Sequence, residues 1–146
     1  MNRTPIVLVT GRYQLGDDPG LFQDALYVGH ELSLPFTRTW DSGGDITLKF
    51  YTHDVETWAD WQGHRVTINN TEIGFLKDDA AEEGGAGEMI PLLIPAAKLQ
   101  AALSGNDRFL LNITLGTQKS TPGMADDFVL WRIESDGTFA AKLGWK

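Results

Sequence analysis

The clearest sign of the fold class is the segment Val66-Thr67-Ile68-Asn69-Asn70-Thr71-Glu72-Ile73-Gly74-Phe75-Leu76. Apolar and polar side chains alternate before Asn69-Asn70, so a β-strand here has one dry face and one wet face. The apolar residues Ile73 and Phe75 resume the pattern after the two asparagines. Because asparagine tolerates the left-handed backbone of a tight turn, the stretch predicts a β-hairpin.

The same period of two recurs along most of the chain and predicts further strands. The run Phe128-Val129-Leu130-Trp131 is apolar at every position, which is typical of a strand covered on both sides. His30 falls on a dry position, which favours a hydrogen-bonded core histidine, and Trp40 and Trp131 are assigned to the core or its rim. The dry positions of the alternating runs are Leu26, Val28, Leu32, Leu34 and Phe36; Ile46, Leu48 and Phe50; Phe109, Leu111, Ile113 and Leu115; and Phe139, Ala141, Leu143 and Trp145.

Residues 95–103 are the one segment that predicts a full helix, and Leu21–Ala25 could form a single helical turn. Proline suits a first helical turn, Leu99 and Leu103 share a face, and Gly105 can end the helix. Many short strands separated by turn signals are typical of a sandwich, and 146 residues suffice for one domain with its own core. We therefore predict an all-β fold: an antiparallel β-sandwich of jelly-roll type with one short α-helix near residues 95–103, in a single domain spanning residues 1–146.

The charge balance argues against one class of partner. The chain has 12 Lys and Arg against 20 Asp and Glu, a formal charge of −8, which repels the phosphates of nucleic acid. No apolar run is long enough for a secretory leader or a membrane span. We expect a soluble chain without a signal peptide or transmembrane segment, which binds neither nucleic acid nor membrane. Its compartment stays open.

The sequence lacks the usual motifs of catalysis. It contains no cysteine, so disulfides, thiolate zinc sites and a cysteine nucleophile are excluded. The histidines His30, His53 and His64 have no metal-binding spacing, and no Gly-x-Ser-x-Gly elbow occurs. We therefore expect no enzymatic activity and no cofactor.

Calcium is the metal that the loops suit best, because hard cations bind oxygen ligands. The candidate ligands are Asp17-Asp18, Asp41 with Asp45, and Asp126-Asp127. None of these spacings matches a recognised calcium loop, and aspartates at such positions also initiate turns. The turn interpretation is preferred, and a structural calcium ion is the alternative.

The hairpin also resembles a known group of folds. Val66–Leu76 is similar to the V-x-V-N-G-x-x-I-G-x-L hairpin of galactose-binding-like jelly rolls and related carbohydrate-binding modules, with Asn70 where they usually carry glycine. The segments Ile90–Pro95, Gly105–Ile113 and Asp126–Leu130 look like later strands of that group. The resemblance implies the sandwich fold and carbohydrate as the ligand class, although these motifs belong to the fold rather than to sugar contacts.

Aromatic residues on a loop are the best candidates for binding. Trp58 and Trp61 lie among polar residues between two predicted strands. An exposed indole can stack on a sugar ring while nearby polar groups bond its hydroxyls; the alternative is that one or both indoles cap an open end of the sandwich. We predict a ligand site formed by Trp58, Trp61, Tyr51, His53, Asp54 and Asp60.

Strand parity suggests a second surface. Lys49, Tyr51 and His53 share the outer face of one predicted strand, and Asn112 and Thr114 share that of another. If the two strands belong to one concave sheet, these side chains form a polar groove with one aromatic residue in its floor.

These observations favour a non-catalytic recognition module that binds carbohydrate through loop aromatics. The alternative is a structural or adaptor protein of a phage particle, secretion system or other assembly, which binds protein through edge strands or the acidic segment Lys77–Glu88, and a homo-oligomer fits this alternative. Charge alone also suits a third function, a small inhibitor that masks a basic protein.

Overall fold

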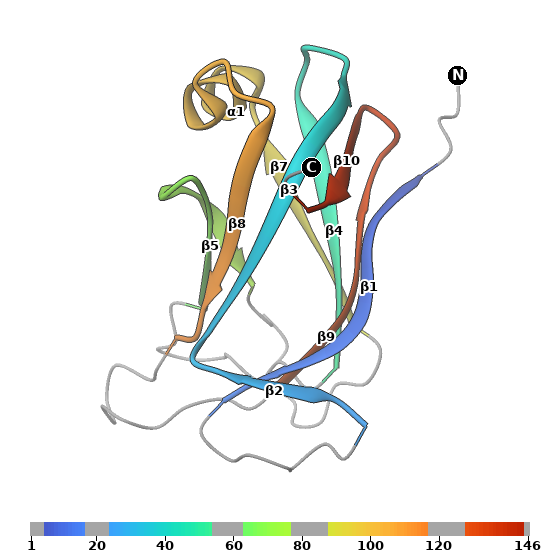
Figure 1. Ribbon diagram of the computed structural model, residues 1–146, viewed down its shortest axis with the longest axis vertical. Helices are drawn as coiled ribbons and strands as arrows, with labels where there is room; N and C mark the ends of the chain where they lie inside the picture. Colours follow the sequence, from blue (N-terminus) through green and yellow to red (C-terminus); the bar gives the residue numbers. More distant parts are fainter. Residues whose placement is uncertain (1–4, 17–23, 54–62, 77–87, 117–127, 145–146) are drawn as a thin grey trace.

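The computed structural model describes residues 5–16, 24–53, 63–76, 88–116 and 128–144. They form two five-stranded sheets with a short helix at one end (Figure 1). In order across the first sheet, the strands are β2 (Leu26–Gly29), β1 (Ile6–Leu15), β9 (Phe128–Ser135), β4 (Ile46–His53) and β7 (Glu88–Ile94). Across the second sheet they are β10 (Phe139–Leu143), β3 (Glu31–Asp41), β8 (Arg108–Thr114), β5 (His64–Ile68) and β6 (Thr71–Leu76).

Strand pairing in both sheets is antiparallel, except that β1 and β2 are parallel. The predicted all-β sandwich with one short helix is therefore confirmed. Each sheet combines strands from distant parts of the chain, because β1 pairs with β9 and β3 pairs with β10.

Alternation along the strands builds the core between the sheets. On β4, Ile46, Leu48 and Phe50 are at most 1% exposed, and the residues between them are half-buried on the outer face. From the second sheet, Phe36 stacks on Phe109 with ring centroids 5.3 Å apart. Removing such rings from water is the main favourable contribution to folding.

The predicted hairpin is the turn between β5 and β6. Asn69 and Asn70 have φ angles of 49° and 68°, so both adopt the left-handed conformation of the two-residue turn that suits twisted strands. The asparagines therefore make the turn that the sequence predicts for them.

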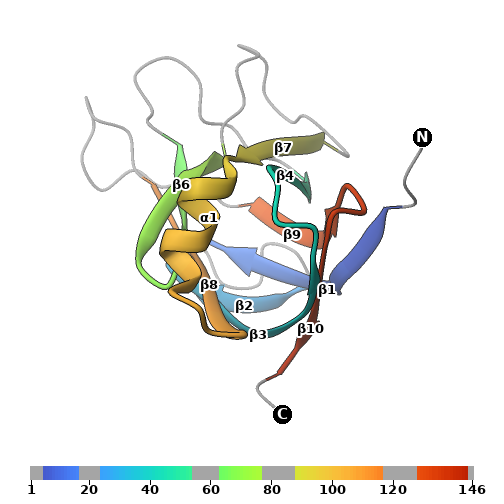
Figure 2. The same ribbon diagram turned by 90° about the horizontal axis from the view of Figure 1, so that it is seen from above.

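The helix α1 (Ala96–Leu103) covers the end of the sandwich between β6 and β8 of one sheet and β7 of the other (Figure 2). Leu99, Ala102 and Leu103 are buried in the core, which confirms the predicted apolar face. The helix is followed by Ser104 in the left-handed conformation, one residue before the predicted Gly105. Within the described residues, no helix has the length and apolar character that crossing a bilayer requires.

Alternation predicts that His30 is the buried histidine, but the structure buries His64 instead. His30 is exposed in the turn between β2 and β3, because Gly29, with a φ of 83°, ends β2 and interrupts the alternation. His64 is 0% exposed, stacks on Phe128 at 4.3 Å, and accepts a hydrogen bond at Nδ1 from the Gly116 N–H.

Three apolar residues predicted at the core or its rim are exposed instead. Leu26 and Leu143 lie on β2 and β10, which are edge strands with a neighbour on one side only. Trp40 lies near the end of β3 and is 47% exposed. The exposure of all three depends on where they lie in the sheet, which the alternation pattern along a strand does not indicate.

Candidate functional site

The structure describes two of the six predicted site residues. Tyr51 and His53 lie on the outer face of β4, and both are half-buried. The other four, Asp54, Trp58, Asp60 and Trp61, lie outside the described residues. The expected contact between Tyr51, His53 and the two indoles stays a prediction.

The groove predicted between Tyr51 and Asn112 does not exist. β4 belongs to the first sheet and β8 to the second, so Asn112 lies beside Ser33 and Thr67 on the outer face of the opposite sheet. Alternation correctly indicates which face of a strand is wet, but it does not indicate which sheet the strand joins.

A different set of residues surrounds Tyr51 on the outer face of the first sheet. The pairing of β9 with β4 shifts register at Trp131, which is the extra residue of a β-bulge between the partners of Tyr51 and Thr52. The Trp131 ring lies 5.2 Å from the Tyr51 ring at an interplanar angle of 52°, and the Arg132 guanidinium lies 6.0 Å from the same ring. The bulge therefore presents two successive residues, Trp131 and Arg132, to one tyrosine.

Glu134 holds the polar part of this group in place. The Tyr51 hydroxyl donates to Glu134 Oε1 at 3.0 Å, and Arg132 Nε and Nη2 each lie 2.6 Å from Glu134 Oε2. Glu134 is 7% exposed, and the cost of burying its carboxylate is offset by these charge-assisted bonds. Burial, followed by the neighbouring Glu134 carboxylate, raises the pKa of the Tyr51 phenol above its ordinary value of 10.0.

We call Tyr51, Trp131, Arg132 and Glu134 the outer-face cluster. It combines two half-buried aromatic rings with a guanidinium whose direction is fixed by a buried carboxylate. Aromatic rings can stack on an apolar ligand face, and the remaining guanidinium and phenol groups can bond hydroxyl or carboxylate oxygens. The arrangement is that of a binding platform.

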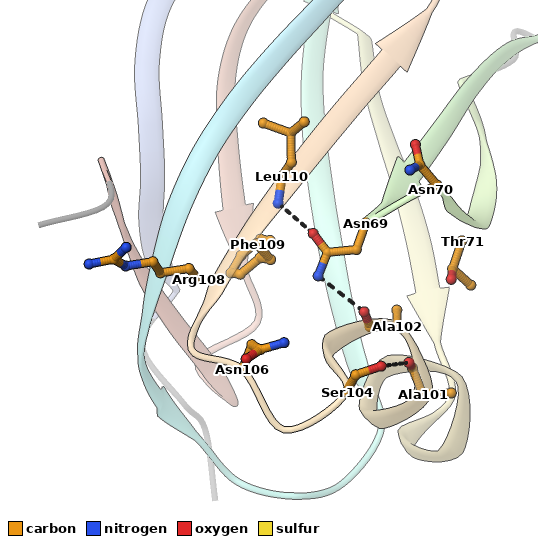
Figure 3. Close-up of a pocket in the computed structure, with 10 residues that line it drawn as sticks. All are labelled: Asn69, Asn70, Thr71, Ala101, Ala102, Ser104, Asn106, Arg108, Phe109 and Leu110. Carbon is orange, nitrogen blue, oxygen red and sulfur yellow. Dashed lines mark hydrogen bonds between the residues drawn. The ribbon is translucent and has the colours of Figure 1, made fainter.

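A hollow of about 640 Å³ lies elsewhere, between the C-terminal turn of α1, the β5–β6 turn and the start of β8 (Figure 3). Asn69 spans one side of it: its Oδ1 accepts from the Leu110 N–H at 2.9 Å, and its Nδ2 donates to the Ala102 carbonyl at 3.1 Å. Asn70 and Thr71 line one side and Asn106 another (Figure 3). The sequence pattern predicts the asparagine turn but not this hollow.

The described aspartates proposed as calcium ligands are engaged by protein donors. Asp41 accepts from the Gly43 N–H at 2.8 Å and from Arg38 and Gln100, and Asp45 accepts from the Ala96 N–H at 2.8 Å. Within the described ranges, no group of three or more His, Cys, Asp or Glu side chains is arranged to hold a metal. The Gly43 bond supports the turn interpretation for Asp41, whereas Asp45 bonds the start of α1. Asp17-Asp18 and Asp126-Asp127 lie outside the described residues.

Comparison with known proteins adds no assignment. No protein-family model, no curated protein and no solved structure matches this chain.

Sequence reasoning missed three of the four members of the outer-face cluster. Arg132 and Glu134 are polar residues that alternate with buried Ile133, so their outward direction could have been read from the sequence. Trp131 could not, because strict alternation places it on the same side as Ile133. Only the bulge brings its ring to Tyr51.

Proposed function

We propose that this protein is a non-catalytic recognition module that binds a saccharide on the outer-face cluster. The observation that carries the proposal is the tilted pair of half-buried rings, Tyr51 and Trp131, flanked by the fixed ion pair of Arg132 and Glu134. Sugar rings present apolar C–H faces and a rim of hydroxyls, and such a site offers a partner to each.

The sequence resemblance adds support of a different kind. Galactose-binding-like jelly rolls and carbohydrate-binding modules are β-sandwiches, and the two-sheet fold agrees with that architecture. Membership of the galactose-binding-like type is part of the proposal, as is a contribution from Trp58, Trp61, Asp54 and Asp60. Because this fold hosts many functions, the outer-face residues carry more weight than the architecture does.

Calorimetric titration of the full chain against a panel of neutral and acidic oligosaccharides tests the proposal. Calorimetry is preferable to fluorescence because five tryptophans contribute to the emission. We expect at least one saccharide to bind, and Trp131→Ala and Tyr51→Ala each to weaken that binding by about tenfold or more.

Trp40→Ala is the matched control, because Trp40 is a partly exposed indole on the other sheet. We expect it to leave the affinity within about twofold. Loss of binding in Trp58→Ala or Trp61→Ala alone would move the site away from the outer-face cluster. Failure of every saccharide to bind would overturn the proposed function.

A second candidate, protein binding within an assembly, is favoured by one further observation. The outward residues of β7 beside the cluster are apolar, and Met89 and Leu93 are 43% and 63% exposed. Exposed apolar side chains next to Tyr, Trp and Arg are typical of protein interfaces. Light scattering over a range of concentrations tests it: an oligomer that Leu93→Asp dissociates, without loss of saccharide binding, would assign β7 to assembly.

A further inference from the structure

The hollow beside α1 exists because β8 is longer than its neighbour on one side. β3 pairs with β8 as far as Arg108, but β5 pairs with it only from Thr114 to Leu111. The turn then begins, and Asn69 exchanges two bonds with Leu110: its N–H donates to the Leu110 carbonyl at 2.9 Å, and its side-chain Oδ1 accepts from the Leu110 N–H at 2.9 Å. The Asn69 side chain thus takes the place of a backbone group in the last pair of hydrogen bonds on the β5 side of β8.

Arg108 lies two residues before Leu110 on β8, where the next such pair of backbone hydrogen bonds would form. In an antiparallel sheet the N–H and C=O of alternate residues point to the same side, so those of Arg108 point to the same side as those of Leu110. Arg108 lines the hollow, and no described residue pairs with its backbone there. The sheet therefore presents one donor and one acceptor, in strand geometry, to an open space.

The side chains around this edge are neutral and polar. The carboxamides of Asn70 and Asn106 and the hydroxyl of Thr71 make no hydrogen bond to other described residues. No carboxylate lines the hollow, although the chain has 20 acidic residues, and the Arg108 guanidinium points away from the asparagines (Figure 3). Carboxamides offer both donors and acceptors, as a peptide group does.

Two other ligand chemistries fit this lining less well. A sugar would lack a stacking partner, because the ring of Phe109 belongs to a residue only 2% exposed. A small anion would meet a lining without an inward-pointing cation (Figure 3). On the helix side Ala101 is exposed, and its methyl group is small enough for a chain to lie against it.

We propose that the hollow is a binding site for a short peptide segment in extended conformation, which pairs with the backbone of Arg108 and is held at its sides by Asn70 and Asn106. The peptide occupies the place that a longer β5–β6 hairpin would fill, which is the strand-addition mode of recognition. The volume of about 640 Å³ lies within the usual range of ligand sites. This site is separate from the outer-face cluster and does not depend on saccharide binding.

Selection from a phage-displayed library of random heptapeptides tests the proposal. Peptides enriched on the full chain are measured by calorimetry against wild type, Ala101→Leu and Ala97→Leu. Both alanines are exposed on α1, but only Ala101 lines the hollow. We expect Ala101→Leu to weaken binding by about tenfold or more and Ala97→Leu to leave it within about twofold.

Backbone methylation of the selected peptide distinguishes strand pairing from other contacts and requires no protein variant. N-methylation of the residue opposite Arg108 should abolish binding, and methylation of its neighbours, whose N–H groups point to the other side, should be tolerated. Equal binding to Ala101→Leu, tolerance of methylation at every position, or no enriched peptide would each overturn the proposal.

Discussion

Glu134 shows what one buried carboxylate does at the residue scale. A carboxylate removed from water costs free energy unless it is paired, and Glu134 is paired with both Arg132 and the Tyr51 hydroxyl. The same bonds orient Tyr51, whose ring contacts that of Trp131, and Arg132, whose guanidinium lies near the Tyr51 ring. Loss of Glu134 should therefore affect the direction of these groups as well as stability.

The pKa of Tyr51 gives a direct test of this arrangement. Burial and the Glu134 carboxylate hold it above 10.0, so Glu134→Gln, which removes the charge, should lower it toward that value. Absorbance titration of tyrosinate checks this, with Tyr51→Phe identifying the signal among three tyrosines. Identical titration curves for wild type and Glu134→Gln would contradict it.

Asp41 carries a pH-dependent part of the stability. Burial raises its pKa, but bonds from the Gly43 N–H, Gln100 and Arg38 outweigh burial and hold the pKa below 3.8. A lowered native pKa means that the contribution is complete above about pH 4 and is lost as the pH falls through the native value. Asp41→Asn should cost about 1–2 kcal/mol at pH 7 and progressively less below pH 4.

Urea denaturation of wild type and Asp41→Asn across this pH range measures the difference. Asp45→Asn, at an exposed neighbour, is the control. If the difference in free energy of unfolding between wild type and Asp41→Asn does not change with pH, the carboxylate charge is not its cause and the prediction is wrong.

At the scale of elements, the β5–β6 turn connects three parts of the fold. Asn69 has a left-handed backbone, and its side chain bonds both the start of β8 and the last turn of α1. Asn70 has the same backbone conformation but an exposed side chain without such bonds. Both asparagines therefore supply the left-handed backbone of the turn, but only the Asn69 side chain also bonds β8 and α1.

Glycine substitution separates these reasons, because glycine accepts the left-handed backbone freely. Asn69→Gly should destabilise the fold by about 1–3 kcal/mol, since two partly buried hydrogen bonds are lost. Asn70→Gly should change stability by less than about 1 kcal/mol. Thermal or urea unfolding measures both, and equal effects at the two positions would refute the assigned role of the Asn69 side chain.

At the scale of the whole molecule, each sheet pairs strands that are far apart in the sequence. β1 lies between β2 and β9, and β3 lies between β10 and β8, so neither half of the chain can complete a sheet alone. Pairings of this kind are non-local, and they favour slow, cooperative folding.

We therefore predict a single unfolding transition over the whole chain, in keeping with the expected single domain. Far-UV circular dichroism and tryptophan fluorescence should give coincident urea curves. Phe109→Ala, which removes a ring stacked on Phe36, should lower the free energy of unfolding by about 3–5 kcal/mol. Both curves should move together to lower urea concentration. Two separated transitions would show that the sheets unfold independently.

The local features of this protein follow from its amino-acid sequence alone. Alternation located the buried residues of β4 and most of those of β3, two asparagines specified the hairpin, and the proline-to-leucine segment specified α1. These features depend on side-chain direction and backbone conformation over a few residues, which the sequence encodes directly.

Contacts in the folded molecule, and not the sequence pattern, establish which strands share a sheet, where the alternation breaks, and where a strand lacks a neighbour. They place Tyr51 and Asn112 on opposite sheets, turn Trp131 outward through a bulge, and leave the Arg108 backbone beside an open hollow. Pairing partners and bulges arise from contacts between distant segments, and the pattern within a single strand carries no record of those contacts.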